Sequence, residues 1–186
     1  MNNSVSYIFL ADGFEEVEAL TCVDVLRRAG MDVKTVSINL GREVTGAHDV
    51  TVLADTLFDD NDYSDAEWLV LPGGLPGAPN LAAHPGVCQA LTRQQQRGGK
   101  VAAICASPAV VLGQLGMLQG RQAVCYPGLE DTVQGVNWLS SQVAIDGNVV
   151  TGNGPAAATA FALALVEITQ GRDVAGQVAS GMLYAN

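Results

Sequence analysis

Cys105 is the residue of this chain best placed to act as a nucleophile. A short apolar run at residues 101–104 ends at this cysteine, and small residues and Pro108 follow before a second apolar run. This pattern predicts a buried strand that turns directly into a helix, because proline fits the first helical turn, where no backbone N–H is needed. Unpaired N–H groups at a helix start favour thiolate over thiol. Cys105 thus matches the serine of a G-x-S-x-G nucleophile elbow.

Glu15, Glu16 and Glu18 supply acidic groups at the start of a helix expected over residues 15–29. Glu15 and Glu18 share one face of that helix. Glu15 is expected among the residues that bind the substrate, although compensation of the helix dipole explains Glu15 and Glu16 equally well. Glu18 is expected to work with Cys105, since burial and a nearby thiolate would keep its carboxyl protonated. A protonated Glu18 would donate a hydrogen bond to the sulfur and transfer a proton during the reaction.

Gly73 and Gly74 lie in a loop of small residues, LPGGLPGAPN, that follows another buried apolar run. Both glycines fit a tight turn that requires positive φ. Beside a nucleophile, their bare N–H groups also fit an oxyanion hole, which the N–H of Ala106 would complete.

Alternating strand and helix patterns position these residues. Residues 4–10 and 31–38 favour strands on either side of the helix at residues 15–29, and this strand–helix–strand unit predicts an α/β fold with parallel pairing. Ligands of such sheets bind at the carboxyl ends of the strands. We therefore expect four loops to converge there: ADGFEEVE, LPGGLPGAPN, ICASP and TGNGP.

The rest of the chain continues the pattern. It predicts strands at residues 67–71, 101–104 and 122–126, helices at residues 81–97 and 156–169 and after Pro108, and an amphipathic segment at residues 172–184. Residues 41–53 favour a small hairpin excursion, residues 55–64 an acidic loop, and the Asp-Gly pair at residues 146–147 a hairpin turn. No repeat or linker interrupts residues 1–186, which predicts a single domain.

Composition narrows the function classes. The net charge of −10 disfavours nucleic acid as a partner, and no apolar run is long enough to span a membrane. The apolar residues 7–11 are followed directly by Asp12, so no secretion signal is expected. We therefore expect a cytoplasmic location. The cysteines lack C-x-x-C spacing, which predicts neither a metal site nor a redox dithiol. We expect three of them to be reduced packing residues: Cys22, Cys88 and Cys125.

No cofactor is expected either. A dinucleotide site would need G-x-G-x-x-G after the first strand, and that motif is missing from the sequence there. Three glutamates also occupy the helix start where a phosphate would bind. The same reasoning disfavours flavin mononucleotide.

Five segments together resemble the ThiJ/PfpI superfamily, in the branch of the parkinsonism-associated protein deglycase and bacterial YajL. They are GFEEVEA, VDVLRRAG, LPGGLPGAPNL, AAICASPAVVL and GPAAATAFALALVE, and the resemblance covers essentially the whole chain. It implies a flavodoxin-like three-layer sandwich with a mostly parallel sheet and helices on both faces, usually a homodimer through the first helix. It also implies Cys105 as the reactive cysteine, Glu18 as its protonated partner, and the backbone of Gly74 and Ala106 facing the substrate oxygen.

The resemblance implies cofactor-free chemistry on a small carbonyl substrate: conversion of reactive dicarbonyls, or removal of early glycation adducts. The alternative is an oxidative-stress sensor or chaperone whose Cys105 is oxidised to a sulfinate. An amidohydrolase or peptidase is a third possibility. It is disfavoured because the protease branch has histidine directly after the nucleophile, where this chain has Ala106.

Two further positions depart from the family pattern near the expected site. Relatives often carry histidine at the position of Tyr126, which can donate a hydrogen bond but is a poor base near neutral pH. They often carry arginine at the position of His48, where a histidine would make anion binding depend on pH. His48 fits an ordinary loop residue as well.

Overall fold

A seven-stranded sheet forms the centre of the computed structural model, which describes residues 4–184. Its strand order is β10-β11-β7-β6-β1-β2-β5, and all neighbours pair in parallel except β10 and β11. The strands are β1 (Val5–Leu10), β2 (Asp32–Ser37), β5 (Thr56–Leu57), β6 (Ala66–Leu71), β7 (Lys100–Ile104), β10 (Val143–Asp146) and β11 (Val149–Gly152).

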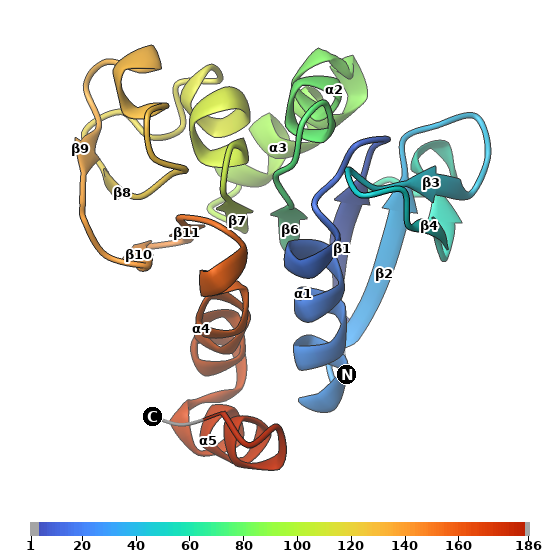
Figure 1. Cartoon of the computed structure of the whole chain (residues 1–186), viewed down its shortest axis with the longest axis vertical. Helices are drawn as coiled ribbons and strands as arrows, with labels where there is room; N and C mark the ends of the chain where they lie inside the picture. Colours follow the sequence, from blue (N-terminus) through green and yellow to red (C-terminus); the bar gives the residue numbers. More distant parts are fainter. Residues whose placement is uncertain (1–3, 185–186) are drawn as a thin grey trace.

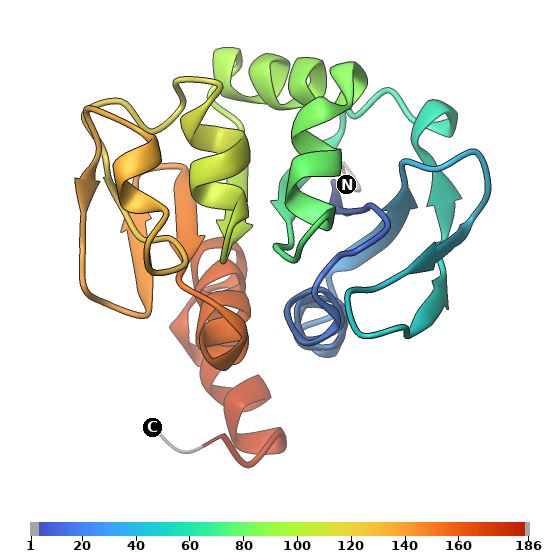
Figure 2. The ribbon, with the colours of Figure 1, turned by 45° about the horizontal axis from the view of Figure 1, so that its top comes forward.

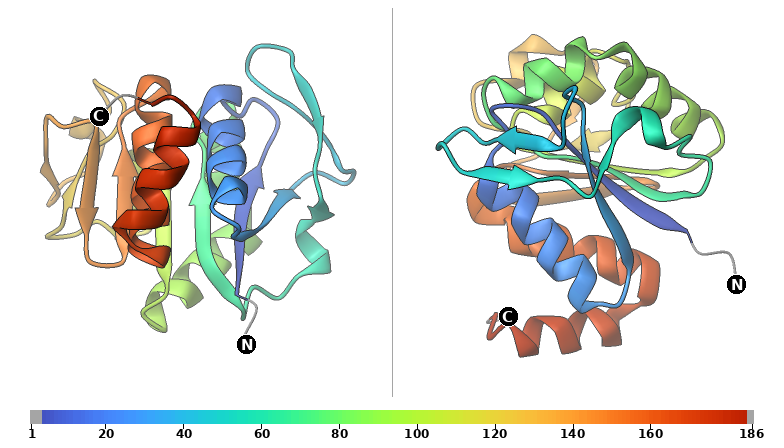
Figure 3. Two further views of the ribbon diagram at one scale, coloured as in Figure 1. Left: turned by 90° about the horizontal axis from the view of Figure 1, so that it is seen from below. Right: turned by 90° about the vertical axis from the view of Figure 1, so that its right-hand side faces the viewer.

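Helices cover both faces of this sheet, as Figures 1 and 3 show. The helices α1 and α4 lie side by side on one face with α5 packed against α4, while α2 and α3 cover the other face. Their bounds are α1 (Glu16–Arg28), α2 (Gly77–Ala83), α3 (Pro85–Gln96), α4 (Ala158–Gln170) and α5 (Arg172–Gly181). The predicted three-layer α/β sandwich with a mostly parallel sheet is confirmed.

The central strands are apolar on both sides because both sides are covered. In β1 all six residues are buried. Ile8 and Leu10 belong to the core on the α1 and α4 side, whereas Tyr7 and Phe9 belong to the core under α2 and α3. This alternation is what two covered faces require, and each fully buried large side chain contributes about 1.5–3 kcal/mol.

Two small pairs of strands lie outside the main sheet. The antiparallel pair β3 (Glu43–Thr45) and β4 (Thr51–Leu53) is the predicted hairpin excursion, and it packs beside the start of α1 (Figure 1). The short strands β8 (Gln122–Ala123) and β9 (Asn137–Trp138) pair in parallel. The predicted turn at residues 146–147 is present between β10 and β11, with Gly147 at a φ of 61°.

The single helix predicted over residues 81–97 is wrong. Two helices occupy that region, α2 and α3, and they meet at His84, whose φ of −86° and ψ of 109° are extended. The cause is Pro85, because a residue before proline is sterically excluded from the helical conformation. Pro85 then begins α3, and His84 Nδ1 accepts a hydrogen bond from the Val87 N–H at 3.2 Å.

Three other expectations need correction. The strand predicted at residues 122–126 is only β8, and the helix expected after Pro108 is a π-helical segment of six residues, Pro108–Gly113. The acidic loop at residues 55–64 contains the edge strand β5 and a 3₁₀ turn, Phe58–Asp60. The ring of Phe58 packs against Phe9 and Tyr63, and this burial of aromatic side chains orders the segment.

The four loops expected at the carboxyl ends of the strands do come together. They follow β11, β7, β6 and β1, which are consecutive neighbours in the sheet. In Figure 2 the segments after β6 and β7 lie near the start of α1, in the middle of the molecule. Within residues 4–184, no helix has both the length and the apolar character that crossing a membrane requires.

Candidate active site

Cys105 occupies a strained turn at the end of β7. Its φ of 63° is in the left-handed region, which side chains other than glycine rarely adopt and which costs about 1–3 kcal/mol. Two backbone hydrogen bonds hold the turn: the Cys105 N–H donates to Gly152 O at 2.9 Å, and Cys105 O accepts from the Tyr126 N–H at 2.7 Å. The side chain is 8% exposed. This is the sharp strand-to-helix turn predicted from the sequence.

Glu18 lies in the first turn of α1 and is fully buried. Its Oε2 accepts the Gly73 N–H at 2.7 Å, while its Oε1 is buried with no hydrogen-bond partner among the described residues. Burial raises the pKa of this carboxyl from 4.5 to about 7, and the charge of Glu15 adds to the effect. Glu18 is therefore protonated in a large fraction of molecules near neutral pH, with Oε1 free to carry the proton.

Cys105 and Glu18 meet at Gly73. A Cβ atom added to Gly73 would lie 2.6 Å from Cys105 Cβ, 2.9 Å from Glu18 Oε2 and 3.0 Å from Cys105 Sγ. No real Cβ has such contacts, so only glycine leaves room for the two side chains to approach each other. Gly73 does not have the positive φ expected for it; Gly74 does, at 93°.

The thiolate expected at Cys105 is not the resting form. Burial, together with the charge and hydrogen bonding of Glu18, raises the pKa of the thiol from its ordinary 9.0 to about 12, although the backbone N–H groups of Gly74 and Ala106 act to lower it. The two backbone groups are outweighed because desolvation and a neighbouring carboxylate both disfavour a second negative charge. Near neutral pH the Cys105–Glu18 pair therefore carries at most one negative charge. Because the two groups interact strongly, the first proton is lost from the pair as a whole and not from one of the two groups alone.

Fewer backbone N–H groups face the cysteine than the predicted oxyanion hole requires. Gly73 was expected to contribute its N–H, but that group donates to Glu18 Oε2. The N–H groups that face the sulfur belong to Gly74 and Ala106. Gly74 also cannot be replaced easily, because a Cβ on it would lie 2.3 Å from Gly13 O.

Ser107 is a site residue that the sequence did not reveal. It is fully buried, and its hydroxyl donates to Pro72 O at 2.5 Å. This bond ties the cysteine turn to the glycine loop after β6. The only sequence signal was a small polar residue inside an apolar run, and its partner is 35 residues away in the chain.

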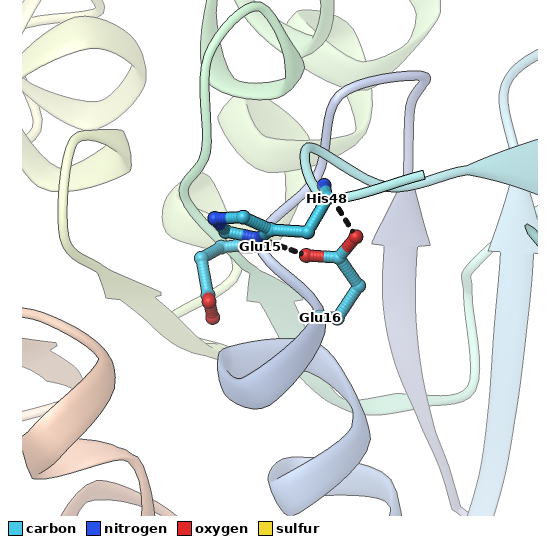
Figure 4. A group of neighbouring side chains, drawn as sticks. All are labelled: Glu15, Glu16 and His48. Carbon is cyan, nitrogen blue, oxygen red and sulfur yellow. Dashed lines mark hydrogen bonds and ion pairs between the residues drawn. The ribbon is translucent and has the colours of Figure 1, made fainter. Parts of the chain in front are cut away.

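Glu15, Glu16 and His48 form a second cluster, drawn in Figure 4. Glu16 accepts the His48 N–H and pairs with His48 Nδ1, each at 2.7 Å. Against the effect of burial, the hydrogen bonds from His48 lower the pKa of Glu16, and the bond to Glu16 raises the pKa of His48. Possible metal-ligand atoms of the three residues lie within 4.8 Å of one another. Hydrogen bonds already engage both carboxylates, since Glu15 Oε2 accepts the Glu18 N–H at 2.7 Å.

Tyr126 and His48, both expected at the site, lie at its margin. Tyr126 contributes its backbone N–H to the Cys105 turn, while its side chain is 49% exposed. The His48 side chain is 72% exposed and is directed to Glu16. The prediction that Cys22 and Cys125 are packing residues is confirmed by their burial; Cys88 is partly buried, and its Sγ donates to Ala82 O at 3.3 Å.

The mostly parallel sheet, the buried cysteine–glutamate pair and the strained strand-to-helix turn together have the geometry of an α/β protein with a nucleophile elbow. Residues 5–168 match the DJ-1/PfpI family, and the chain belongs to this family. Within it, the chain falls in the DJ-1 branch. The resemblance seen in the sequence motifs is thereby confirmed.

The relatives of this branch match nearly the whole chain. Protein dj-1beta of Drosophila melanogaster is 36% identical over 180 residues, which is 96% of this chain and 96% of that protein. The Parkinson disease protein 7 homolog of Danio rerio is 35% identical over 95% of both chains. The structure of oxidized Toxoplasma gondii DJ-1 superposes with a TM-score of 0.95 at 34% identity, covering 98% of this chain and 100% of that one.

Two further comparisons bear on function. A deglycase of Thermococcus kodakarensis is 34% identical over 151 residues, 80% of this chain and 89% of that protein. The chain spans only 40% and 44% of the length of two Arabidopsis thaliana relatives, the DJ-1 homologs B and A.

Proposed function

We propose that the protein is a cysteine-dependent enzyme that acts, without a cofactor, on small reactive dicarbonyls or glycation adducts. The observation that carries this proposal is the meeting of the Cys105 thiol and the buried Glu18 carboxyl across Gly73. The deglycase of Thermococcus kodakarensis supports the substrate class, because it is a relative of the same family. The N–H groups of Gly74 and Ala106 would hold the substrate oxygen.

The chemistry begins with addition of the thiol to an aldehyde carbon. The Cys105 sulfur forms a bond to that carbon, the C=O π electrons move to oxygen, and the thiol proton reaches this oxygen through Glu18, giving a hemithioacetal. Glu18 as carboxylate then removes the proton from the former aldehyde carbon and returns it to the neighbouring carbonyl carbon, while the hydroxyl proton of the hemithioacetal moves to the neighbouring carbonyl oxygen. The product is a 2-hydroxy thioester. Water cleaves the thioester and releases the 2-hydroxy acid and the thiol. A carboxyl with a pKa of about 7 suits a group that must both give and take protons.

The test is to incubate the purified protein with methylglyoxal and measure lactate. Cys105→Ala should abolish lactate formation, and Glu18→Gln should lower kcat by at least about a hundredfold, the usual contribution of general acid–base catalysis. Cys88→Ala is the matched control, because Cys88 is partly exposed on α3 and lies outside the site. Lactate formation that survives Cys105→Ala would overturn the mechanism.

A second candidate function is sensing of oxidative stress, with chaperone action as a related alternative. It is favoured by the surroundings of Cys105 Sγ, where two backbone N–H groups and a protonated Glu18 would all donate to sulfinate oxygens. Mass spectrometry after mild peroxide treatment tests it. Selective sulfinate at Cys105 supports sensing, and equal oxidation of all four cysteines contradicts it.

A peptidase function has less support. It would need a base beside the thiol, and within this chain the rings of its two histidines are engaged elsewhere: His48 with Glu16 and His84 with the start of α3.

We also propose a homodimer, working in the cytoplasm. Apolar side chains remain exposed on α1 and on the neighbouring β3–β4 hairpin: Val17 (52%), Leu20 (40%), Val50 (47%) and Leu53 (66%). Four free cysteines suit a reducing compartment. Light scattering should show a dimer for the wild type and a monomer for Leu20→Glu, while Leu40→Glu, at a fully exposed leucine outside α1, should leave the dimer intact.

A further inference from the structure

Glu15 is the N-cap residue of α1, a role in which glutamate is unusual. Its Oε2 accepts the Glu18 N–H at 2.7 Å, and the residue is only 8% exposed. Serine, threonine, aspartate and asparagine are preferred at N-caps because their short side chains reach the backbone with little loss of freedom. Capping alone therefore does not explain a buried glutamate at this position.

Three hydrogen bonds connect Glu15 to the catalytic pair. The Glu15 N–H donates to Gly73 O at 3.1 Å, the Gly73 N–H donates to Glu18 Oε2 at 2.7 Å, and the Glu18 N–H donates to Glu15 Oε2 at 2.7 Å. These bonds close a ring through three residues. The ring holds the Glu18 carboxyl beside Gly73, where Cys105 also lies, because a Cβ on Gly73 would contact both side chains.

We propose that Glu15 is a positioning residue of the active site, which holds Glu18 against Gly73 through this ring. The negative charge of Glu15 also favours the protonated form of the Glu18 carboxyl. The role differs from the substrate contact expected for Glu15 from the sequence. It rests on the proposed function, since it concerns the same cysteine–glutamate pair.

Burial is the main cause of the raised pKa of Glu18, and Glu15 is a charged group beside it that adds to this effect. At the start of α1, Glu18 faces the N-cap Glu15 and the buried thiol of Cys22. From the turn after β7 it faces Cys105, and from the loop after β6 it faces the N–H of Gly73. Cys22 is neutral, because burial holds the pKa of its thiol far above the ordinary value. Among residues 4–184, Glu15 is thus the carboxylate whose charge acts on Glu18, and this charge adds to the effect of burial in raising the pKa of Glu18.

The β3–β4 turn holds Glu15 in place from outside. The Ala47 N–H donates to Phe14 O at 2.8 Å, and the Gly13 N–H donates to Thr45 O at 2.7 Å. Next to Glu15, Glu16 is bound to His48 through two hydrogen bonds. The chain segment that carries Glu15 is therefore fixed on both sides, as a positioning residue requires.

Two variants separate the two parts of this role. Glu15→Gln keeps an oxygen that accepts the Glu18 N–H but removes the charge, whereas Glu15→Ala removes both. Asp173→Asn is the matched control, because Asp173 is an exposed acid in the first turn of a different helix, α5. The main readout is the rate of Cys105 alkylation by iodoacetamide against pH, measured by mass spectrometry of the Cys105 peptide, and it needs no turnover. Lactate formation from methylglyoxal is the second readout.

For Glu15→Gln we expect the alkylation midpoint near pH 7 to move down by about half a pH unit or more, since a nearby negative charge is lost. For Glu15→Ala we expect kcat to fall at least about tenfold with little change in KM, because Glu18 is no longer held in place. Asp173→Asn should match the wild type in both. The proposal is wrong if Glu15→Gln keeps the wild-type midpoint, or if Glu15→Ala loses only stability. Should the wild type form no lactate, the proposed function fails, yet the alkylation profiles still decide the role of Glu15.

Discussion

The carboxyl of Glu18 and the thiol of Cys105 approach each other across Gly73, whose N–H donates to Glu18 Oε2 at 2.7 Å. One residue without a side chain thus orients the acid and leaves room for the nucleophile. The two groups come from the first turn of α1 and the end of β7, which are far apart in the sequence.

Replacing Gly73 with alanine should damage the site directly. The new Cβ would lie 2.6 Å from Cys105 Cβ, so one of the two loops must shift, and we expect a loss of stability of about 1–3 kcal/mol together with loss of lactate formation. Gly176→Ala is the control, because Gly176 is exposed in α5 and a Cβ there meets nothing within 4 Å. That control should raise stability by up to about 1 kcal/mol in urea unfolding. A Gly73→Ala protein with wild-type stability and activity would contradict the geometry.

Glu18 should make the protein less stable as the pH rises. Its pKa is about 7 in the folded protein and 4.5 ordinarily, so the folded state binds more protons between these values. The contribution is fully present below pH 4.5 and is lost as the pH rises through 7, and it amounts to about 3 kcal/mol. Urea unfolding of wild type and Glu18→Gln from pH 4 to pH 8 measures it. The stability of Glu18→Gln relative to wild type should increase across this range; a constant difference would show that Glu18 has an ordinary pKa.

The alkylation profile of Cys105 should report the shared titration. In the wild type, loss of the first proton from the pair near pH 7 produces a fraction of thiolate beside protonated Glu18, so the rate should rise there and rise again near pH 12. In Glu18→Gln the step near pH 7 should disappear and a single step should lie below pH 12, because Glu18 no longer raises the pKa of the thiol. Two steps retained in Glu18→Gln would assign the first to another group.

The Glu16–His48 pair should stabilise the protein in acidic rather than alkaline solution. The pKa of His48 is raised above its ordinary 6.5, so the stabilisation is fully present below that pH and is lost as the pH rises through the folded-state pKa. His48→Gln should remove this dependence and leave the active-site thiol unaffected. Thermal unfolding of wild type and variant at pH 5.5 and pH 8.5 provides the comparison, and equal differences at both pH values would count against the ion pair.

Much of the architecture could be predicted from local patterns. The alternation of apolar strands with a helix between residues 15 and 29 defined a parallel α/β sheet, because the period of the apolar residues reports which faces are covered. Cys105 could be placed at a strand end and Glu18 at a helix start for the same reason. The end of a helix at His84 could also be predicted, since Pro85 excludes the helical conformation from the residue before it. The apolar residues on both sides of His84 nevertheless favoured one continuous helix.

The sequence by itself therefore determined the fold class, the family and the two central residues of the candidate site, Cys105 and Glu18. Only the tertiary structure decided the hydrogen-bond partners and the pKa values of these residues. The partner of the Gly73 N–H is a carboxyl 55 residues away, and the cap of α1 is a glutamate that also acts on Glu18. The pKa of Cys105 rises instead of falling because burial and Glu18 outweigh the backbone N–H groups. Hydrogen-bond partners and desolvation depend on which loops the sheet brings together. These contacts join residues distant in the sequence, so local sequence patterns do not predict them.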